Sequence, residues 1–450
     1  MSLFNTLSTG ASGLGASSTN LSVIGDNIAN LGTTGYKSST ASFADGFSNM
    51  MSGLGRPAQV GTGASLSDVA IDFGQGNLAQ SSSPLDVAIL GSGFFEVARG
   101  DQTFYSRDGS FHLDADSRIV NSAGLQLQGY QAINGVVTST LGGLEVDPAA
   151  LPQQATTGID LTATLAADAD NATSPLGDLR TATPFDGTVA APTMETLSQA
   201  ADYSTSVTVY DSLGLPHDVT LMFERDPIAA DTWNVYAVVD GGEVDTNGDG
   251  LVDGIPGTAY EIGTGTVQFD VDGALVATSG ITGAGGWTFA GAAPFQPAFN
   301  LGLDAAGNPT PGGLSMVGSS SFVTTIAQDG YPAGTLDSLS VEADGTIRGY
   351  YTNGEDQALG RIAVATFASS GGLDRVGGNL YRATAASGDP AIGVAGVGGR
   401  GTTSGNALET SNVDLEDQFV AMIQAQRSYQ ANTGVIQSAD QALQQLMQLV

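Results

Sequence analysis

Apolar residues recur at alternating spacings of four and three at both ends of the chain, and this pattern constrains the fold more than any other feature. The positions are Leu3, Leu7, Leu14, Leu21, Ile24, Ile28 and Leu31 near the N-terminus, and Leu415, Phe419, Met422, Tyr429, Ile436, Leu443, Met447 and Val450 near the C-terminus. A sustained seven-residue repeat predicts helices that pair along a narrow seam with left-handed supercoiling. We expect the two helices to pair and to form a seam for assembly. The alternative is two amphipathic helices packed on the protein's own core.

Glycine and charge both favour assembly through the ends. Gly10, Gly13 and Gly15 each cost a helix about 1 kcal/mol relative to alanine, so we expect a loose N-terminal helix that orders against neighbours. Residues 1–44 hold one acidic and one basic side chain, whereas residues 151–320 hold 21 acidic residues and two arginines. Near-neutral ends can therefore crowd together in a polymer while a charged outer part stays solvated.

Composition excludes several classes of function. The net charge is −33, and of the 13 basic residues only Lys37 is a lysine. The arginines are scattered singly, so we expect neither a nucleic-acid interface nor a basic membrane-binding patch. The chain has no cysteine, which excludes disulfides and thiolate chemistry. We find no apolar run of membrane-spanning length and no basic segment at the start, and expect neither membrane insertion nor a cleaved signal peptide.

The middle of the chain has a β pattern. Short β-branched and aromatic runs are separated by glycine, asparagine and aspartate turns, without the alternation of strands and helices that parallel-sheet enzymes need. We therefore predict a mixed α and β fold, in which N- and C-terminal helices pair as a coiled coil with two nested antiparallel β-domains between them. The expected parts are residues 1–35 with 410–450 as a helical inner domain, 36–71 with 400–409 as a connector, 72–148 with 322–399 as an inner β-domain and 149–321 as an inserted outer β-domain.

One acidic loop matches the first nine positions of a calcium-binding loop. Its candidate ligands are Asp245, Asn247, Asp249 and Asp253, with Gly250 at the sixth position. Carboxylate and amide oxygens at this spacing suit a hard divalent cation. The twelfth position is a proline instead of a bidentate glutamate, so any Ca²⁺ binding should be weak. The alternative is an acidic hairpin turn, and we expect no other cofactor.

Enzyme signatures fail their context tests. Residues 396–401 fit a G-x-G-x-x-G pattern, but we expect neither a preceding strand nor a following helix, so a hinge is the better interpretation. His112 and His217 are the only histidines, and without a nucleophile elbow we interpret them as surface or turn residues. Lys37 stands in a serine-rich segment, where we expect it to be solvated or paired with an acid of a neighbouring subunit. We therefore predict that the protein is not an enzyme.

Several strings in order along the chain resemble the flagellar rod and hook family. Residues 21–30 (LSVIGDNIAN) and 33–38 (TTGYKS) are similar to its N-terminal signature. Residues 411–415 (SNVDL) and 426–432 (QRSYQAN) are similar to its C-terminal signature. The inner β-domain of the family is matched by the strings LDVAI, GFF and YSRDGSF, which begin at residues 85, 93 and 105.

The size of the insertion separates members within the family. A rod subunit lacks a large outer insertion, whereas this chain carries about 170 residues there, and VYDSLG at residues 209–214 and QDGY at 328–331 look hook-like. The resemblance therefore favours a hook subunit. A distal rod subunit is one alternative, and a calcium-loaded, acidic, β-rich surface adhesin that works as a monomer is another.

The resemblance implies a mechanical function outside the cell. Copies of the chain would polymerise into a curved hollow tube, the flagellar hook, that acts as a universal joint and transmits torque from rod to filament. Further partners would be rod and hook–filament junction proteins, the hook cap and the flagellar type III export apparatus, which needs no cleaved signal. Glycines in residues 35–71 would tolerate the backbone changes of a bending joint, although this stretch also fits an ordinary surface loop.

Overall fold

The computed structural model describes residues 3–47, 61–147, 150–169, 175–182, 185–188, 190–229, 231–283, 286–303 and 312–448. The chain divides into two compact units. The terminal unit comprises Met1–Pro148, Asp337–Tyr350 and Asp356–Val450, and the inserted unit comprises Ala149–Leu336 and Tyr351–Glu355. None of the helices in the described parts of the chain combines the length and the hydropathy that a membrane span requires.

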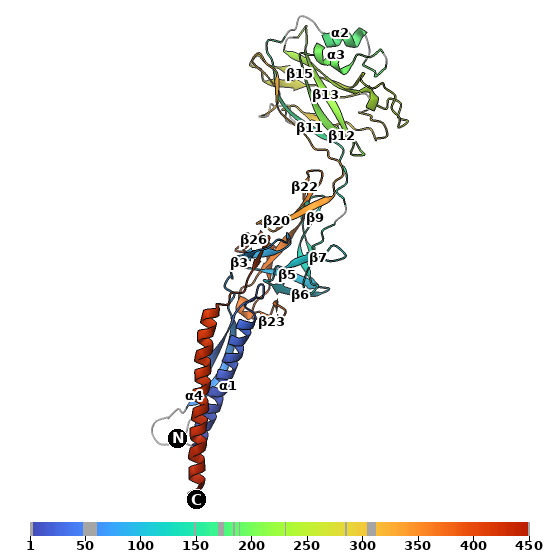
Figure 1. Cartoon of the computed structure of the whole chain (residues 1–450). Coiled ribbons are helices and arrows are strands. Elements are labelled where there is room, and N and C mark those ends of the chain that lie inside the picture. The colour runs from blue at the N-terminus through green and yellow to red at the C-terminus, as the bar shows by residue number, and fades with distance from the viewer. Residues whose placement is uncertain are drawn as a thin grey trace. The chain divides into compact units, whose positions relative to one another are not determined.

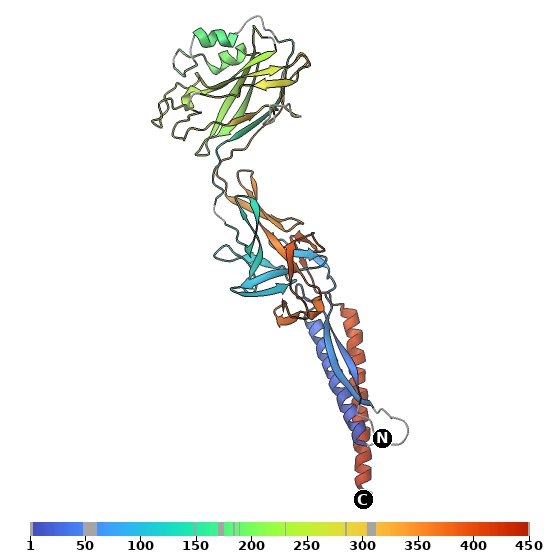
Figure 2. The same cartoon turned by 180° about the vertical axis from the view of Figure 1, so that it is seen from behind.

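Two helices from opposite ends of the chain lie side by side in the terminal unit (Figures 1 and 2). They are α1 (Leu3–Ala29) and α4 (Leu415–Gln448). Asp414 begins α4, because its carboxylate accepts the N–H groups of Glu416 and Asp417 at 2.8 and 3.2 Å. An antiparallel hairpin of β1 (Ser39–Phe47) and β2 (Gly61–Ile71) packs on α1, so much of the expected connector is paired strand. The rest of it, residues 48–60, lies outside the described residues.

The remainder of the terminal unit is a β-region built from segments on both sides of the insertion. One sheet follows the order β20-β21-β22-β9-β5-β6-β24-β23, with β7, β8, β10 and β25 attached, and two short pairs, β26–β4 and β27–β3, lie outside it. The strands are β3 (Leu78–Gln80), β4 (Val87–Leu90), β5 (Phe94–Arg99), β6 (Gln102–Ser106), β7 (Phe111–Leu113), β8 (Ile119–Asn121), β9 (Gln126–Ile133), β10 (Val136–Gly143), β20 (Leu336–Val341), β21 (Thr346–Tyr351), β22 (Asp356–Thr366), β23 (Asp374–Gly377), β24 (Leu380–Arg382), β25 (Ala391–Val394), β26 (Thr402–Gly405) and β27 (Ala407–Glu409). Buried rings of Phe94, Tyr105 and Tyr381 form one cluster of its core.

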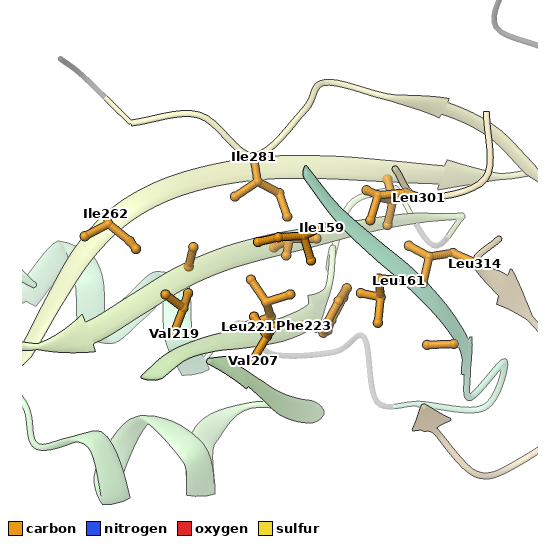
Figure 3. Packing of buried hydrophobic residues seen from close by; sticks show 14 of the residues in the cluster. Ile159, Leu161, Val207, Val219, Leu221, Phe223, Ile262, Ile281, Leu301 and Leu314 are labelled. Carbon is orange, nitrogen blue, oxygen red and sulfur yellow. The ribbon is translucent and has the colours of Figure 1, made fainter. Parts of the chain in front are cut away.

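The inserted unit buries one large hydrophobic cluster between two sheets. Its elements are β11 (Gly158–Leu165), α2 (Pro175–Ala182), α3 (Met194–Ala200), β12 (Tyr203–Tyr210), β13 (Pro216–Arg225), β14 (Thr232–Asp240), a 3-10 turn (Gly241–Glu243), β15 (Ala259–Phe269), β16 (Leu275–Thr278), β17 (Ala298–Asn300), β18 (Ser315–Met316) and β19 (Phe322–Gln328). Strands β12 to β16 form one antiparallel sheet in sequence order, and β11 pairs with β17, β18 and β19 in the other. Figure 3 shows Ile159 and Leu161 of β11 among Val219, Leu221 and Phe223 of β13.

Alternation along β13 and β14 buries both faces of the five-stranded sheet. Leu221 and Val235 point into the large cluster, whereas Met222 and Tyr236 point to the opposite face. Leu176 of α2 and Leu197 of α3 are buried there with Met222 and Tyr236, so the two short helices cover that face.

Two expectations about the β-domains were wrong in detail. The inner β-domain does not resume at residue 322, because β19 pairs antiparallel with β11 and its Val323 and Ile326 pack on the large cluster. The inserted unit therefore extends to Leu336. Its strands are also not all antiparallel, since β17 and β18 run parallel to β11. The prediction of terminal helices in contact with more than one β-domain between them is confirmed, in a chain that is mostly β.

Two of the four glycines of α1 mark a close approach of α4. A Cβ atom at Gly10 would lie 2.9 Å from Ile436 Cγ1, and one at Gly13 would lie 2.8 Å from Asn432 Nδ2. A Cβ atom at Gly15 meets nothing within 4 Å. The glycines at positions 10 and 13 therefore let the two backbones approach, which the interpretation of glycine as a helix-weakening residue did not anticipate.

We predict opposite outcomes for alanine at these positions. Gly15→Ala should stabilise α1 by about 1 kcal/mol through helix propensity alone. Gly10→Ala gains the same propensity but presses on Ile436, so it should give no net stabilisation or a loss. Helix content from circular dichroism during thermal unfolding measures the difference, and equal gains in the two variants would contradict the close packing.

Candidate functional site

The contact surface between α1 and α4 combines small and polar side chains with Ile436, which lies against Gly10. Ala425 and Ala439 are the most buried residues of α4, and α1 buries Ser17, Ile24 and Asn27. The Asn432 amide donates to Ser17 Oγ at 3.4 Å. The small residues let the two helices come close together.

The predicted seam residues do not all lie between the two helices of one chain. Leu7, Leu14, Leu21, Ile28, Met422, Ile436 and Leu443 are half-buried, Ile24 is buried, and Leu31, Leu415, Phe419 and Tyr429 are exposed. The side chains of Leu3 and Met447, and the whole of Val450, lie outside the described residues. Their use as a seam between copies stays a prediction.

One face of α4 carries a row of exposed apolar side chains. Leu415, Phe419 and Ile423, spaced by four residues, are 37, 47 and 50 % exposed. We call these three residues the α4 stripe. In a strongly acidic chain, such a row is available for contact with another surface.

Asn27 joins the two helices to the first strand. Its amide nitrogen donates to the Ser39 carbonyl at 2.8 Å and to Gln418 Oε1 of α4 at 3.1 Å. Its amide oxygen accepts the Ser39 N–H at 2.9 Å. One buried side chain therefore gives Ser39 both of its backbone partners and fixes α1 relative to β1 and α4.

Further polar contacts surround Asn27, and we call residues 26–39 with 409–418 the helix junction. The Tyr36 hydroxyl reaches Asp26 Oδ2 at 3.1 Å, and the Arg375 guanidinium lies 4.6 Å from the centre of the Tyr36 ring. Burial raises the pKa of Tyr36 above its ordinary value. Ahead of α4, Asn412 accepts the Ser38 N–H at 2.8 Å and donates to the Asp72 carbonyl at 2.9 Å. Both chain ends are thus tied to β1 and β2 beside the β-region.

Lys37 lies at the centre of the helix junction and is completely buried. Its ammonium donates to Glu409 Oε1 and to the Gly74 carbonyl, both at 2.7 Å. Arg107 donates to Glu409 Oε2 at 3.1 Å, so one carboxylate holds two cations. Burial lowers the pKa of Lys37 and of Arg107, with Glu409 opposing the shift in both.

The expectation for Lys37 was therefore wrong. It is neither solvated nor paired with another subunit, because its carboxylate partner comes from β27 of the same chain, 372 positions away in sequence. A serine-rich neighbourhood suggests exposure, but no local pattern reveals a partner at such a separation. Only the TTGYKS string hinted that this lysine has a fixed role.

Asn27→Ala should destabilise the terminal unit, because the Ser39 N–H and C=O lose their buried partner. An unsatisfied buried polar group costs about 1–3 kcal/mol. Asn30→Ala is the matched control, since its half-buried amide bonds only to nearby residues, donating to Asp26 and accepting from the Thr33 hydroxyl. Denaturant unfolding of the full chain measures both, and equal stability of the two variants would contradict a structural role for Asn27.

The acidic loop of the inserted unit forms hydrogen bonds within itself. Asp245 accepts the N–H groups of Gly248 and Gly250 at 2.6 and 2.7 Å, and Asp253 accepts from the Asn247 amide at 3.0 Å. Burial raises the pKa of Asp245, but these N–H groups outweigh it and hold the pKa below its ordinary value. Within the described residues, no three His, Cys, Asp or Glu side chains are arranged to hold a metal. Calcium binding by Asp245, Asn247, Asp249 and Asp253 stays a prediction.

The histidines and the glycine-rich loop differ from expectation in part. His112 is exposed on β7, but His217 is buried in β13, stacked on Phe289 at 3.7 Å between Glu243 and Asp211. Alternation along β13 explains this, because His217 shares a face with Val219. A strand, β25, does precede residues 396–401, contrary to expectation, but β26 and not a helix follows them. The loop therefore has no helix N-terminus to hold a phosphate.

Family models match four parts of the chain. Residues 7–37 match the model "Flagella basal body rod protein" and residues 404–449 match "Flagellar basal body rod FlgEFG protein C-terminal". Residues 88–163 match "Flagellar hook protein FlgE/F/G D1 domain" and residues 179–331 match "Flagellar basal body protein FlaE D2 domain". The first two matches cover most of α1 and α4. They also include Lys37 and Glu409 of the helix junction.

Curated relatives match nearly the whole chain. The flagellar hook protein FlgE of Escherichia coli K12 is 36 % identical over 447 residues, covering 97 % of this chain and 98 % of the relative. The hook protein FlgE of Treponema pallidum is 32 % identical over 478 residues, covering 99 % and 100 %. The crystal structure of Helicobacter pylori hook protein FlgE2 shares the fold, with a TM-score of 0.51 and 15 % identity over 74 % of this chain and all of that one. The chain belongs to the flagellar hook protein family.

Proposed function

We propose that copies of this chain polymerise through their terminal helices into a curved, hollow hook that works as a universal joint between rod and filament. The α4 stripe is the observation that carries the proposal. The hook family is structural, so the chain is a structural hook subunit and not an enzyme.

The α4 stripe supports assembly on energetic grounds. Full burial of a leucine, phenylalanine or isoleucine side chain contributes roughly 1.5–3 kcal/mol. Leu415, Phe419 and Ile423 remain substantially exposed although α1 lies against the same helix. Contact with a second copy would bury them, and the pairing of α1 with α4 would then continue as coiled-coil packing between copies.

Charge supports the same arrangement. Residues 151–320 carry 21 acidic residues and two arginines, so the inserted units of neighbouring copies repel one another. Contacts between inserted units would then be weak enough to slide and re-form as the tube bends. The near-neutral helices carry no such repulsion, so they would hold the polymer together.

The proposed location follows from the family. The subunit would reside in the hook outside the cell, after export through the flagellar type III apparatus without a cleaved signal. Its heterologous partners would be the rod, the hook–filament junction proteins and the hook cap. We propose no contact with nucleic acid and no insertion into a membrane.

Removal of the α4 stripe should prevent assembly. In high sulfate, which strengthens apolar burial and screens charge, the wild-type chain should form curved tubes visible by negative-stain electron microscopy. Phe419→Ala/Ile423→Ala should form none. The control Ile228→Ala/Val271→Ala removes two fully exposed apolar side chains of the inserted unit and should assemble normally.

Other outcomes of this experiment discriminate between functions. Straight wild-type tubes would favour a distal rod subunit. Wild-type monomers with protease-resistant ends would favour the adhesin, because the helices would then belong to a private core. Tubes from the double α4 variant would contradict the stripe as an assembly surface.

We also propose a weak Ca²⁺ site at the loop of Asp245, Asn247, Asp249 and Asp253. Their oxygen atoms support it, although the loop's own N–H groups compete for the carboxylates. Both tryptophans, Trp233 and Trp287, are buried in the inserted unit, so their fluorescence follows its unfolding. Millimolar Ca²⁺ should raise the melting temperature in wild type and not in Asp245→Asn, and no shift in wild type would reject the site.

A further inference from the structure

The two oxygen atoms of the Glu409 carboxylate have different sets of hydrogen-bond donors. Its Oε1 atom accepts from Lys37 at 2.7 Å and also from the Gly76 N–H at 2.8 Å. Among the described residues, its Oε2 atom accepts from Arg107 alone, at 3.1 Å. Without Lys37 both carboxylate oxygens therefore keep a donor, whereas without Arg107 one buried oxygen has none.

The net charge of the three buried groups also indicates that Lys37 is the more dispensable cation. Arg107 and Glu409 together are neutral, so Lys37 adds an excess positive charge to a buried group. A buried cation is costly unless it is well paired. Burial also lowers the pKa of Lys37, with Glu409 opposing the shift.

The two cations also differ in their anchorage. Arg107 follows β6 directly, donates to the Gly91 carbonyl at 2.7 Å and lies 5.4 Å from the centre of the Phe94 ring. Within the described residues, the Lys37 ammonium makes one hydrogen bond besides that to Glu409, to the Gly74 carbonyl, and Lys37 lies in the segment that leads out of α1. Arg107 is thus built into the β-region, whereas Lys37 arrives with the N-terminal helix.

We propose that Arg107 and Glu409 form a neutral ion pair in the β-region that exists without Lys37, and that the Lys37 side chain inserts beside this pair and can withdraw from it. Insertion of Lys37 couples the ordering of α1 to the β-region, and its withdrawal leaves the ion pair of Arg107 and Glu409 intact. A helix that contains four glycines thereby gains an anchor that it can also release. This inference goes beyond the hook function and does not depend on it.

Calorimetry of the full chain tests the asymmetry between the two cations. Trp233 and Trp287 fluorescence identifies the transition of the inserted unit, and the remaining transition belongs to the terminal unit. Lys37→Met should move the terminal-unit midpoint by at most about 2 °C, whereas Arg107→Met should lower it by at least about 6 °C or prevent folding. The control Asp374→Asn breaks an exposed ion pair with Arg382 and should shift the midpoint by about 1 °C or less.

Proteolysis of the wild-type chain tests directly whether the Lys37 side chain withdraws. Lys37 is the only lysine, so a lysine-specific protease has a single site in the chain. Below the melting transition it should cut the bond between Lys37 and Ser38, and the cut chain should keep the calorimetric transition of the β-region. Equal losses from Lys37→Met and Arg107→Met, failure of Lys37→Met to fold, or a bond that stays uncut until the β-region unfolds would each overturn the proposal.

Discussion

Polar contacts between the two chain ends orient α1 and α4 relative to the first two strands of the terminal unit. Asn27 supplies both backbone partners of Ser39 and reaches α4 through Gln418, while Asn412 holds Ser38 and Asp72 from the other end of the chain. A hydrogen bond fixes direction as well as distance, which apolar contact does not. These directional bonds therefore fix the path of each helix at the end beside the β-region.

Residues 36–71 with 400–409 were expected to be a connector, and the contacts of their described parts indicate a defined geometry. Residues 39–47 and 61–71 form a paired hairpin on α1, and the ion pair of Lys37 with Glu409 joins the adjoining segments. Gly35 adopts φ +67°, and a Cβ atom there would lie 2.5 Å from the Asp108 nitrogen. Glycine at this position therefore serves close packing of the junction on the β-region and not freedom of motion.

The features predictable from sequence were those with a local period. The heptad spacing predicted helices at both ends, and the turn-rich β pattern predicted strands and an insertion between them. The face of α4 against α1 was harder, because Ala425, Asn432 and Ala439 are too small or polar to stand out in an apolar ladder. The pairing of β19 with β11 and of Lys37 with Glu409 joins residues far apart in sequence, where no period operates.

Two faces of α4 carry different side chains. One face places alanine and asparagine in close contact with α1, and the α4 stripe exposes leucine, phenylalanine and isoleucine elsewhere on the helix. If the large side chains faced α1, the pair would be stable alone and would offer little to a neighbour. Because the α4 stripe stays exposed although α1 packs against the same helix, the proposed contact with further copies would add to the stability of the helix pair.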